Sequence, residues 1–75
     1  MENIIEVPDR NLVYWLGIRD LKTNTKTDVY KNVISDKYYA NTFTKDGSPI
    51  SLNKEFKSVK DCYEHHCIMI DQLIN

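Results

Sequence analysis

The chain has 75 residues, of which 41% are hydrophobic and 28% charged, and its formal net charge is −1. This composition is too apolar for a disordered chain and is typical of a globular domain. A chain of this length forms one small domain, residues 1–75, and offers a binding face more readily than a deep catalytic cleft. We therefore expect a binding protein and no enzymatic activity.

No apolar run reaches the roughly 18 residues of a membrane span. The N-terminal sequence MENIIEVPDRN also lacks the basic start and long apolar centre of a signal peptide. The expected location is the cytoplasm, with no membrane partner. The two cysteines, Cys62 and Cys67, fit this expectation, because five residues of helix leave their side chains about 140° apart. Two free thiols are typical of a reducing compartment.

The first predicted element is a strand in the segment NLVYWLGIRD. Its side chains would alternate between two faces of a sheet. One face would carry Leu12, Tyr14, Leu16 and Ile18, and the other would carry Val13, Trp15, Gly17 and Arg19. Because both faces carry bulky side chains, we expect this strand to be central in the sheet.

Two further strands are predicted after a polar turn around Asn24. The segments VYKNVI and KYYANTF have the β-branched and aromatic residues that strands favour, although Val29 to Phe43 could also form an irregular connection. The dipeptide Asp46-Gly47 then suits a tight hairpin turn. The segment PISLNKEF follows as an edge strand, since Pro49 has no backbone donor for a sheet ladder.

The clearest predicted element is a helix from about Val59 to Leu73. Ser58 stands before it and Asp61 follows three residues later, which is the pattern of an N-terminal capping box. The fold class predicted is α+β, with an antiparallel three- to four-stranded sheet packed against one C-terminal helix. The predicted core consists of Leu12 or Trp15, with Ile50, Phe56, Cys62, Tyr63, His66, Ile70 and Leu73.

The stretch EFKSVKDCYEHHC, residues 55–67, gathers residue types that bind metals or act in catalysis. Cys62 and His66 have the spacing of two zinc ligands on a helix, but zinc needs four converging ligands, and Cys67 and His65 are the only other Cys and His. A cysteine beside a histidine can be a nucleophile with its base, yet adjacent helix positions point apart. We expect no catalytic residue, metal or cofactor, with Cys62 in the core, His66 at its edge and His65 in solvent.

Charge is unevenly distributed along the chain. From Arg19 to Lys60 there are nine Lys or Arg against five Asp or Glu, whereas the remaining segments have one against six. Lysines interleaved with aromatic residues are typical of surfaces that bind the phosphates and bases of nucleic acids. The alternative is that these lysines are solvated and protect the edges of the sheet.

The segment from Asp46 onward resembles two known families. Phe56, Ser58, Asp61 and Cys62 lie in the register of the arm-binding domain of tyrosine integrases and of the related plant AP2-type domain. The same segment is similar to the small YegP-like domain of unknown function. Its corresponding residues are Asp46, Gly47, Ile50, Phe56, Ser58 and Cys62. Both resemblances imply a sheet with one helix, and the first implies DNA binding through the sheet.

We expect a small non-enzymatic protein that binds and modulates another protein. A short chain rich in Lys, Asn and Ile is typical of phage or mobile-element accessory proteins, and its partner would be a host or competing protein that it inhibits. DNA or RNA binding through a basic, aromatic sheet face is the alternative, and edge-strand pairing with its own copy would give a homodimer. The predicted partner-binding residues are Tyr14, Trp15, Tyr30, Tyr38, Tyr39, Lys26, Lys31, Lys37 and Lys45.

Overall fold

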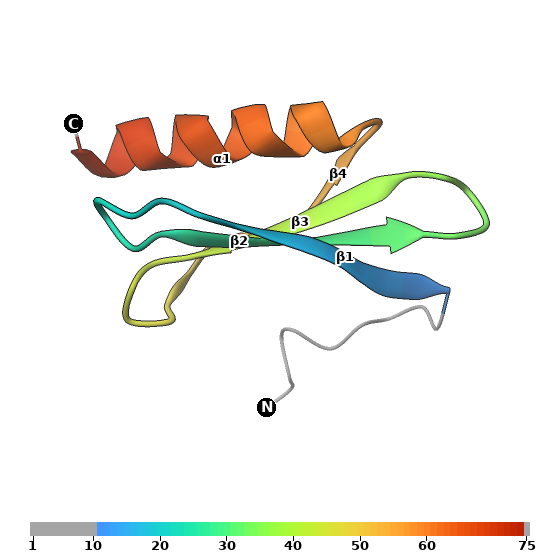
Figure 1. Cartoon of the computed structure of the whole chain (residues 1–75), viewed down its shortest axis with the longest axis horizontal. Coiled ribbons are helices and arrows are strands. Elements are labelled where there is room, and N and C mark those ends of the chain that lie inside the picture. The colour runs from blue at the N-terminus through green and yellow to red at the C-terminus, as the bar shows by residue number, and fades with distance from the viewer. Residues whose placement is uncertain (1–10, 75) are drawn as a thin grey trace.

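The computed structural model describes residues 11–74 and confirms the α+β class (Figure 1). Four antiparallel strands lie side by side in the order in which the chain makes them. The elements are β1 (Leu12–Arg19), β2 (Lys26–Asn32), β3 (Tyr38–Phe43), β4 (Pro49–Phe56) and α1 (Val59–Ile74). The sheet is therefore a simple meander, with β1 and β4 as its two edges and α1 following the last strand.

The helix α1 lies across one face of the sheet, where it packs on β2, β3 and β4 (Figure 1). The fully buried apolar residues are Val29, Ala40 and Cys62, one each from β2, β3 and α1. Leu16, Ile18, Tyr38 and Phe56 pack around them as partly buried residues. The core is one thin layer between sheet and helix, as the chain length requires.

Much of that layer is polar. Thr25, Thr27 and Thr42 are completely buried, and His66 of α1 is only 2% exposed. The Thr27 hydroxyl is 2.6 Å from Nδ1 of His66 and 2.8 Å from the Thr42 hydroxyl. Buried polar groups are tolerated when they are hydrogen-bonded to one another, and this chain of contacts satisfies that condition.

The prediction that the first strand is central is wrong, because β1 is an edge strand. The predicted alternation of its side chains is also interrupted. A bulge between Tyr14 and Leu16 places Tyr14 opposite Tyr30 but Leu16 opposite Val29. A bulge adds one residue and reverses the side-chain faces beyond it. Bulk on both faces of this strand therefore marks an exposed edge and not a buried centre.

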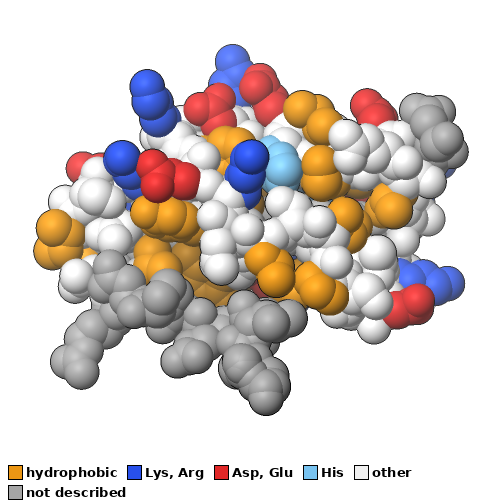
Figure 2. All heavy atoms as spheres, turned by 180° about the vertical axis from the view of Figure 1, so that it is seen from behind, with side chains coloured by type: hydrophobic (Ala, Val, Ile, Leu, Met, Phe, Trp, Pro, Cys, Tyr) orange, Lys and Arg blue, Asp and Glu red, His pale blue; other side chains and the backbone are white. Residues whose placement is uncertain are grey.

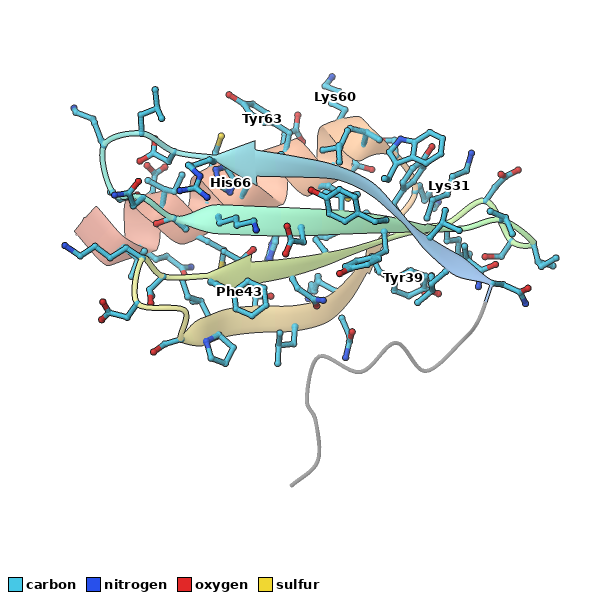
Figure 3. All side chains as sticks on the ribbon, turned by 60° about the horizontal axis from the view of Figure 1, so that its bottom comes forward. Lys31, Tyr39, Phe43, Lys60, Tyr63 and His66 are labelled. Atoms are coloured by element: carbon cyan, nitrogen blue, oxygen red, sulfur yellow. The ribbon has the colours of Figure 1, made fainter. Side chains whose placement is uncertain are left out.

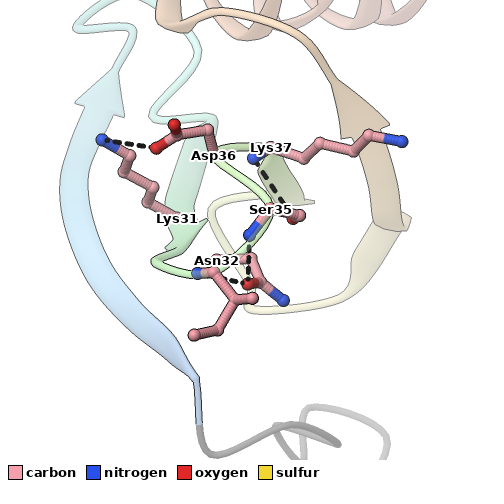
Figure 4. A network of polar contacts seen from close by, with 6 residues as sticks. Lys31, Asn32, Ser35, Asp36 and Lys37 are labelled. Carbon is pink, nitrogen blue, oxygen red and sulfur yellow. Dashed lines mark hydrogen bonds and ion pairs between the residues drawn. The ribbon is translucent and has the colours of Figure 1, made fainter.

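The second strand begins earlier than predicted, at Lys26, and ends at Asn32. Val33 and Ile34 lie in the turn that follows and are exposed. The Asn32 side-chain oxygen accepts hydrogen bonds from the backbone N–H groups of Ile34 and Ser35, at 2.9 and 3.0 Å (Figure 4). Such side-chain bonds to the backbone end a strand and form a turn.

The predicted local signals at the other turns are confirmed. Gly47 has a φ of 87°, the left-handed conformation expected in the turn between β3 and β4. Pro49 is the first residue of edge strand β4. The Ser58 hydroxyl accepts a hydrogen bond of 3.2 Å from the Asp61 backbone N–H and caps α1.

The predicted buried face of the helix is confirmed only in part. Cys62 and His66 are buried, but Tyr63 is 54% exposed and Leu73 is 45% exposed. The prediction of Tyr63 and Leu73 in the core is therefore wrong, because the helix covers β2, β3 and β4 but reaches little of β1, and part of its apolar stripe has no strand beneath it. Within the described residues, no helix has the length and hydrophobicity needed to cross a membrane.

Candidate functional site

The residues predicted to bind a partner lie on two different faces of the sheet. Trp15, Lys31 and Tyr38 are on the face that α1 partly covers. Tyr14, Tyr30 and Tyr39 are on the opposite face, which we call the open face. Figure 3 shows Tyr39 and Phe43 on this open face and His66 on the helix side. The structure therefore does not form one aromatic, basic face from these residues.

On the helix side, Trp15, Lys31 and Tyr38 form a compact cluster beside the core, against which Tyr38 packs. The Trp15 and Tyr38 rings meet edge to face, with centroids 6.2 Å apart. The Lys31 ammonium lies 4.7 Å from the Trp15 ring centroid and 5.6 Å from that of Tyr38. It is also 3.5 Å from the Asp36 carboxylate (Figure 4). These contacts hold the indole in one orientation, although the Trp15 residue is 47% exposed.

The two neighbours of Trp15 are also exposed. Val13 is 41% exposed and Tyr14 is 56% exposed, so three consecutive apolar or aromatic residues face solvent on edge strand β1. We call Val13, Tyr14 and Trp15 the edge patch. Single exposed apolar residues are ordinary, but adjacent ones on an unpaired strand edge form a surface that favours association.

On the open face, Tyr14 and Tyr30 are cross-strand partners whose rings meet edge to face at 5.6 Å. Burial, followed by the nearby Asp28 carboxylate, raises the pKa of Tyr30, so its phenol stays neutral near pH 7. Tyr39 lies opposite Tyr30 on β3, and its hydroxyl donates a 3.3 Å hydrogen bond to Glu55. These tyrosines form an amphipathic row with polar ends.

Most of the predicted phosphate-binding lysines have carboxylate partners. Lys37 lies 3.0 Å from Glu55, and Lys26 lies 3.5 Å from Asp28. Figure 2 shows basic and acidic side chains interspersed along the upper part of one view and at its right, with no continuous basic surface in that view. No ion pair is recorded for Lys45 within the described part of the chain. A mixture of basic and acidic side chains is expected if these lysines are solvated and protect the edges of the sheet.

One local concentration of positive charge does occur, where the turn between β1 and β2 lies near the turn between β3 and β4. A cleft of about 340 Å³ lies there. It is lined by Arg19, Asn24, Lys26, Thr44, Lys45, Asp46 and Gly47. We call it the basic cleft. Sequence reasoning named Lys26 and Lys45 but missed Arg19, because its proximity to Lys45 depends on strand pairing.

The CYEHHC segment has the environment of a packing helix. Burial, followed by the neighbouring Asp61 charge, raises the pKa of the Cys62 thiol to about 11, so the thiol is protonated and a poor nucleophile at neutral pH. His65 was expected in solvent, but it is partly buried. Its Nε2 is 3.1 Å from the Ser51 hydroxyl, and its ring centroid is 5.1 Å from that of Phe56. Both cysteines are free, and residues 11–74 contain no cluster of three potential metal ligands.

No known protein family matches the chain, nor does any curated protein or solved structure.

Proposed function

We propose that this chain is a small non-enzymatic binding protein that docks on another protein through the edge patch. The observation that carries the proposal is the run of exposed residues Val13, Tyr14 and Trp15 on an edge strand that the helix leaves largely uncovered. A phage or mobile-element accessory protein would use such a surface to bind and modulate a host or competing protein. Its free cysteines, Cys62 and Cys67, fit action in the cytoplasm.

The Trp15 cluster has the properties of a binding hot spot. Tryptophan, tyrosine and arginine dominate hot spots because a large, rigid side chain buries much area at little entropic cost. Lys31 and Tyr38 already hold the Trp15 ring. Covering this pre-ordered indole with a partner therefore costs less side-chain entropy than covering a freely rotating side chain would.

The occupant that best fits the edge patch is an extended segment of the partner. Among the described residues, the outer edge of β1 has no neighbouring strand, so its backbone groups are placed to pair with an added strand. Because Tyr14 lies on the open face and Trp15 on the helix side, aromatic side chains would contact the added strand from both faces of the sheet. Backbone pairing would supply affinity, and the aromatic residues would supply specificity.

The test compares Trp15→Ala with Leu21→Ala. Leu21 is 86% exposed and lies in the turn at the far end of β1, so it controls for loss of exposed apolar area. With wild-type and variant proteins as bait in extracts of a plausible host, we expect a partner that Leu21→Ala retains. Trp15→Ala should weaken binding by about 30-fold, the effect of losing about 2 kcal/mol at a hot spot. Equal retention by both variants would refute the edge patch as the binding surface.

A homodimer through paired β1 strands is the competing occupant of the same edge. Sedimentation equilibrium of the pure protein distinguishes a homodimer from a monomer that binds another protein. A monomer at tens of micromolar leaves the edge available to a partner. A dimer that Trp15→Ala dissociates would show that a second copy takes the place proposed for the partner strand.

Nucleic-acid binding through the whole open face is less well supported. Lys26 and Lys37 have acidic partners at 3.0–3.5 Å, and Lys31 lies on the other face beside Asp36. Each pair would have to break before its lysine could neutralise a phosphate. A gel shift at low salt with duplex DNA, single-stranded DNA and RNA is expected to show weak or no binding. A salt slope near −3 to −4, about 0.9 for each phosphate contacted, would instead favour this alternative.

A further inference from the structure

The basic cleft has a charge arrangement that the fold alone does not need. Arg19 and Lys26 are direct cross-strand partners on β1 and β2. Like charges placed directly opposite each other in an antiparallel pair are destabilising. Lys45, just after β3, adds a third cation from another part of the chain. The three cations thus converge at one end of the sheet although their repulsion opposes this arrangement.

The acidic residues nearby only partly offset this charge. Asp28 lies 3.5 Å from the Lys26 ammonium, and Asp46 lines the cleft. No ion pair is recorded for Arg19 or Lys45 in the structure of residues 11–74. The cleft therefore keeps a positive excess, and an anion placed between Arg19 and Lys45 would relieve the repulsion between Arg19 and Lys26.

The remaining lining residues are suited to hold oxygen atoms. The Thr44 hydroxyl oxygen accepts a 3.2 Å hydrogen bond from the Ser48 backbone N–H, which leaves its own O–H able to donate. Asn24 supplies a side-chain amide on a residue in the left-handed conformation, with φ of 59°. Gly47 has no side chain, and the space around its α-carbon is open. The donors come from both turns, so the paired strands fix their spacing.

We infer that the basic cleft binds a phosphate group. Arg19 supplies a planar guanidinium that matches two phosphate oxygens at once, and Lys26 and Lys45 supply point charges. The volume of about 340 Å³ is at the small end of ligand sites, which suits a small phosphate compound or a single backbone phosphate of a nucleic acid. This site is separate from the edge patch and does not rest on it.

The test is a titration of isotope-labelled full-length protein with inorganic pyrophosphate, followed by amide chemical shifts. We expect saturable shifts at Arg19, Lys26 and Gly47, with little change at Trp15. Lys45→Gln and Arg19→Gln should each weaken binding by at least about tenfold, the effect of losing one charge-assisted hydrogen bond. The matched control is Lys57→Gln, which removes the same charge at an exposed position outside the cleft and should leave the affinity unchanged.

A second arm uses a short single-stranded DNA in place of pyrophosphate. Tighter binding of DNA, lost in Lys45→Gln, assigns a phosphodiester as the natural source of the phosphate group. Tighter binding of pyrophosphate assigns a small phosphate compound. The inference fails if neither ligand gives saturable shifts at millimolar concentration, or if Lys57→Gln weakens binding as much as Lys45→Gln does.

Discussion

The two edges of the sheet are equally long but are protected very differently. Strand β4 begins with Pro49, is distorted at Asn53, where φ is 56°, and carries Lys54 and Glu55. Proline, bulges and charges are the usual devices that stop an edge from pairing with another chain. The helix also anchors this side of the sheet, because His65 of α1 contacts β4.

Strand β1 has few of these protections. Its sequence LVYWLGIR has one charge, at its last position, and the helix packs mainly on the other three strands. One bulge, near Trp15, is its only distortion of register. Within residues 11–74, the β4 edge thus contributes directly to helix packing, whereas the β1 edge carries few protections against pairing.

The first prediction tests this contrast with two aromatic residues. Phe56→Ala on β4 should lower the free energy of unfolding by about 2–4 kcal/mol, because the ring packs against the core and His65. Trp15→Ala on β1 should cost only about 1 kcal/mol, since the Trp15 residue is half exposed and loses mainly its contacts with Tyr38 and Lys31. Urea denaturation measures both values. Equal losses would show that β1 is as integral to the core as β4.

The second prediction concerns the polar contacts by which the helix sits on the sheet. Thr27→Val removes the hydroxyl that meets both His66 and Thr42, and leaves two buried polar groups without that partner. The expected cost is about 1–3 kcal/mol. Amide hydrogen exchange should become faster in α1 and in the parts of β2 and β3 that it covers, but should change little along β1. A variant as stable as the native chain would show that these hydroxyls contribute nothing to helix packing.

The third prediction is that the free energy of unfolding depends on pH through His66, on the helix-covered face of the sheet. Burial lowers the pKa of His66, more than the facing Asp20 carboxylate raises it, and neighbouring His65 lowers it further. The unfolded chain therefore binds a proton more readily. The contribution of neutral His66 to the free energy of unfolding is fully present above its pKa in the unfolded chain, near 6.5. It is lost as pH falls through the lower pKa that His66 has in the folded chain. His66→Gln should flatten this slope in urea titrations between pH 7 and 5.

His65 is the control for that slope. Burial, followed by the Lys54 charge, also lowers the pKa of His65. Because His65 is less buried than His66, His65→Gln should remove the smaller part of the pH dependence. An unchanged slope in His66→Gln would assign the effect to other groups.

Local signals in the sequence predicted the elements well but not how they pack. The Ser58 cap, the turn at Gly47 and the edge position of Pro49 each depend on a few neighbouring residues, and all three are confirmed. The buried threonines were missed because Thr is usually exposed, and His66, the residue that satisfies Thr27, lies 39 residues away. The bulge at Trp15 was missed because alternation assumes an unbroken ladder.

The candidate surfaces were predicted as residue types but not as sites. Trp15, Lys31 and Tyr38 meet on the helix side, because Trp15 shares a face with Val13, the cross-strand partner of Lys31, whereas Tyr14, Tyr30 and Tyr39 lie on the open face. Which side of a sheet a residue occupies depends on register, and a shift of one residue reverses it. Alternation already placed Tyr14 and Trp15 on opposite faces, but which of those faces the helix covers could come only from the strand pairing.

The smallest predicted effect tests how loosely the β1 edge is packed. A Cβ added at Gly17 would lie 2.6 Å from the Tyr14 hydroxyl oxygen, with the next nearest atom, from Asp28, at 3.7 Å. Replacing a strand glycine by alanine gains about 0.5–1 kcal/mol from reduced freedom of the unfolded chain. Since Tyr14 is 56% exposed, its ring can move aside, at the cost of part of its contact with Tyr30.

We therefore expect Gly17→Ala to be nearly neutral in the native chain and stabilising by about 0.5–1 kcal/mol in a Tyr14→Phe background, which lacks the obstructing oxygen. A double-mutant cycle in urea measures this coupling. If β1 were packed as tightly as β4, Tyr14 could not move, and Gly17→Ala alone would destabilise the chain by more than about 1 kcal/mol. That result would contradict the loosely held edge on which the proposed strand addition depends, because a strand that admits a partner must let its exposed aromatic residues rearrange around it.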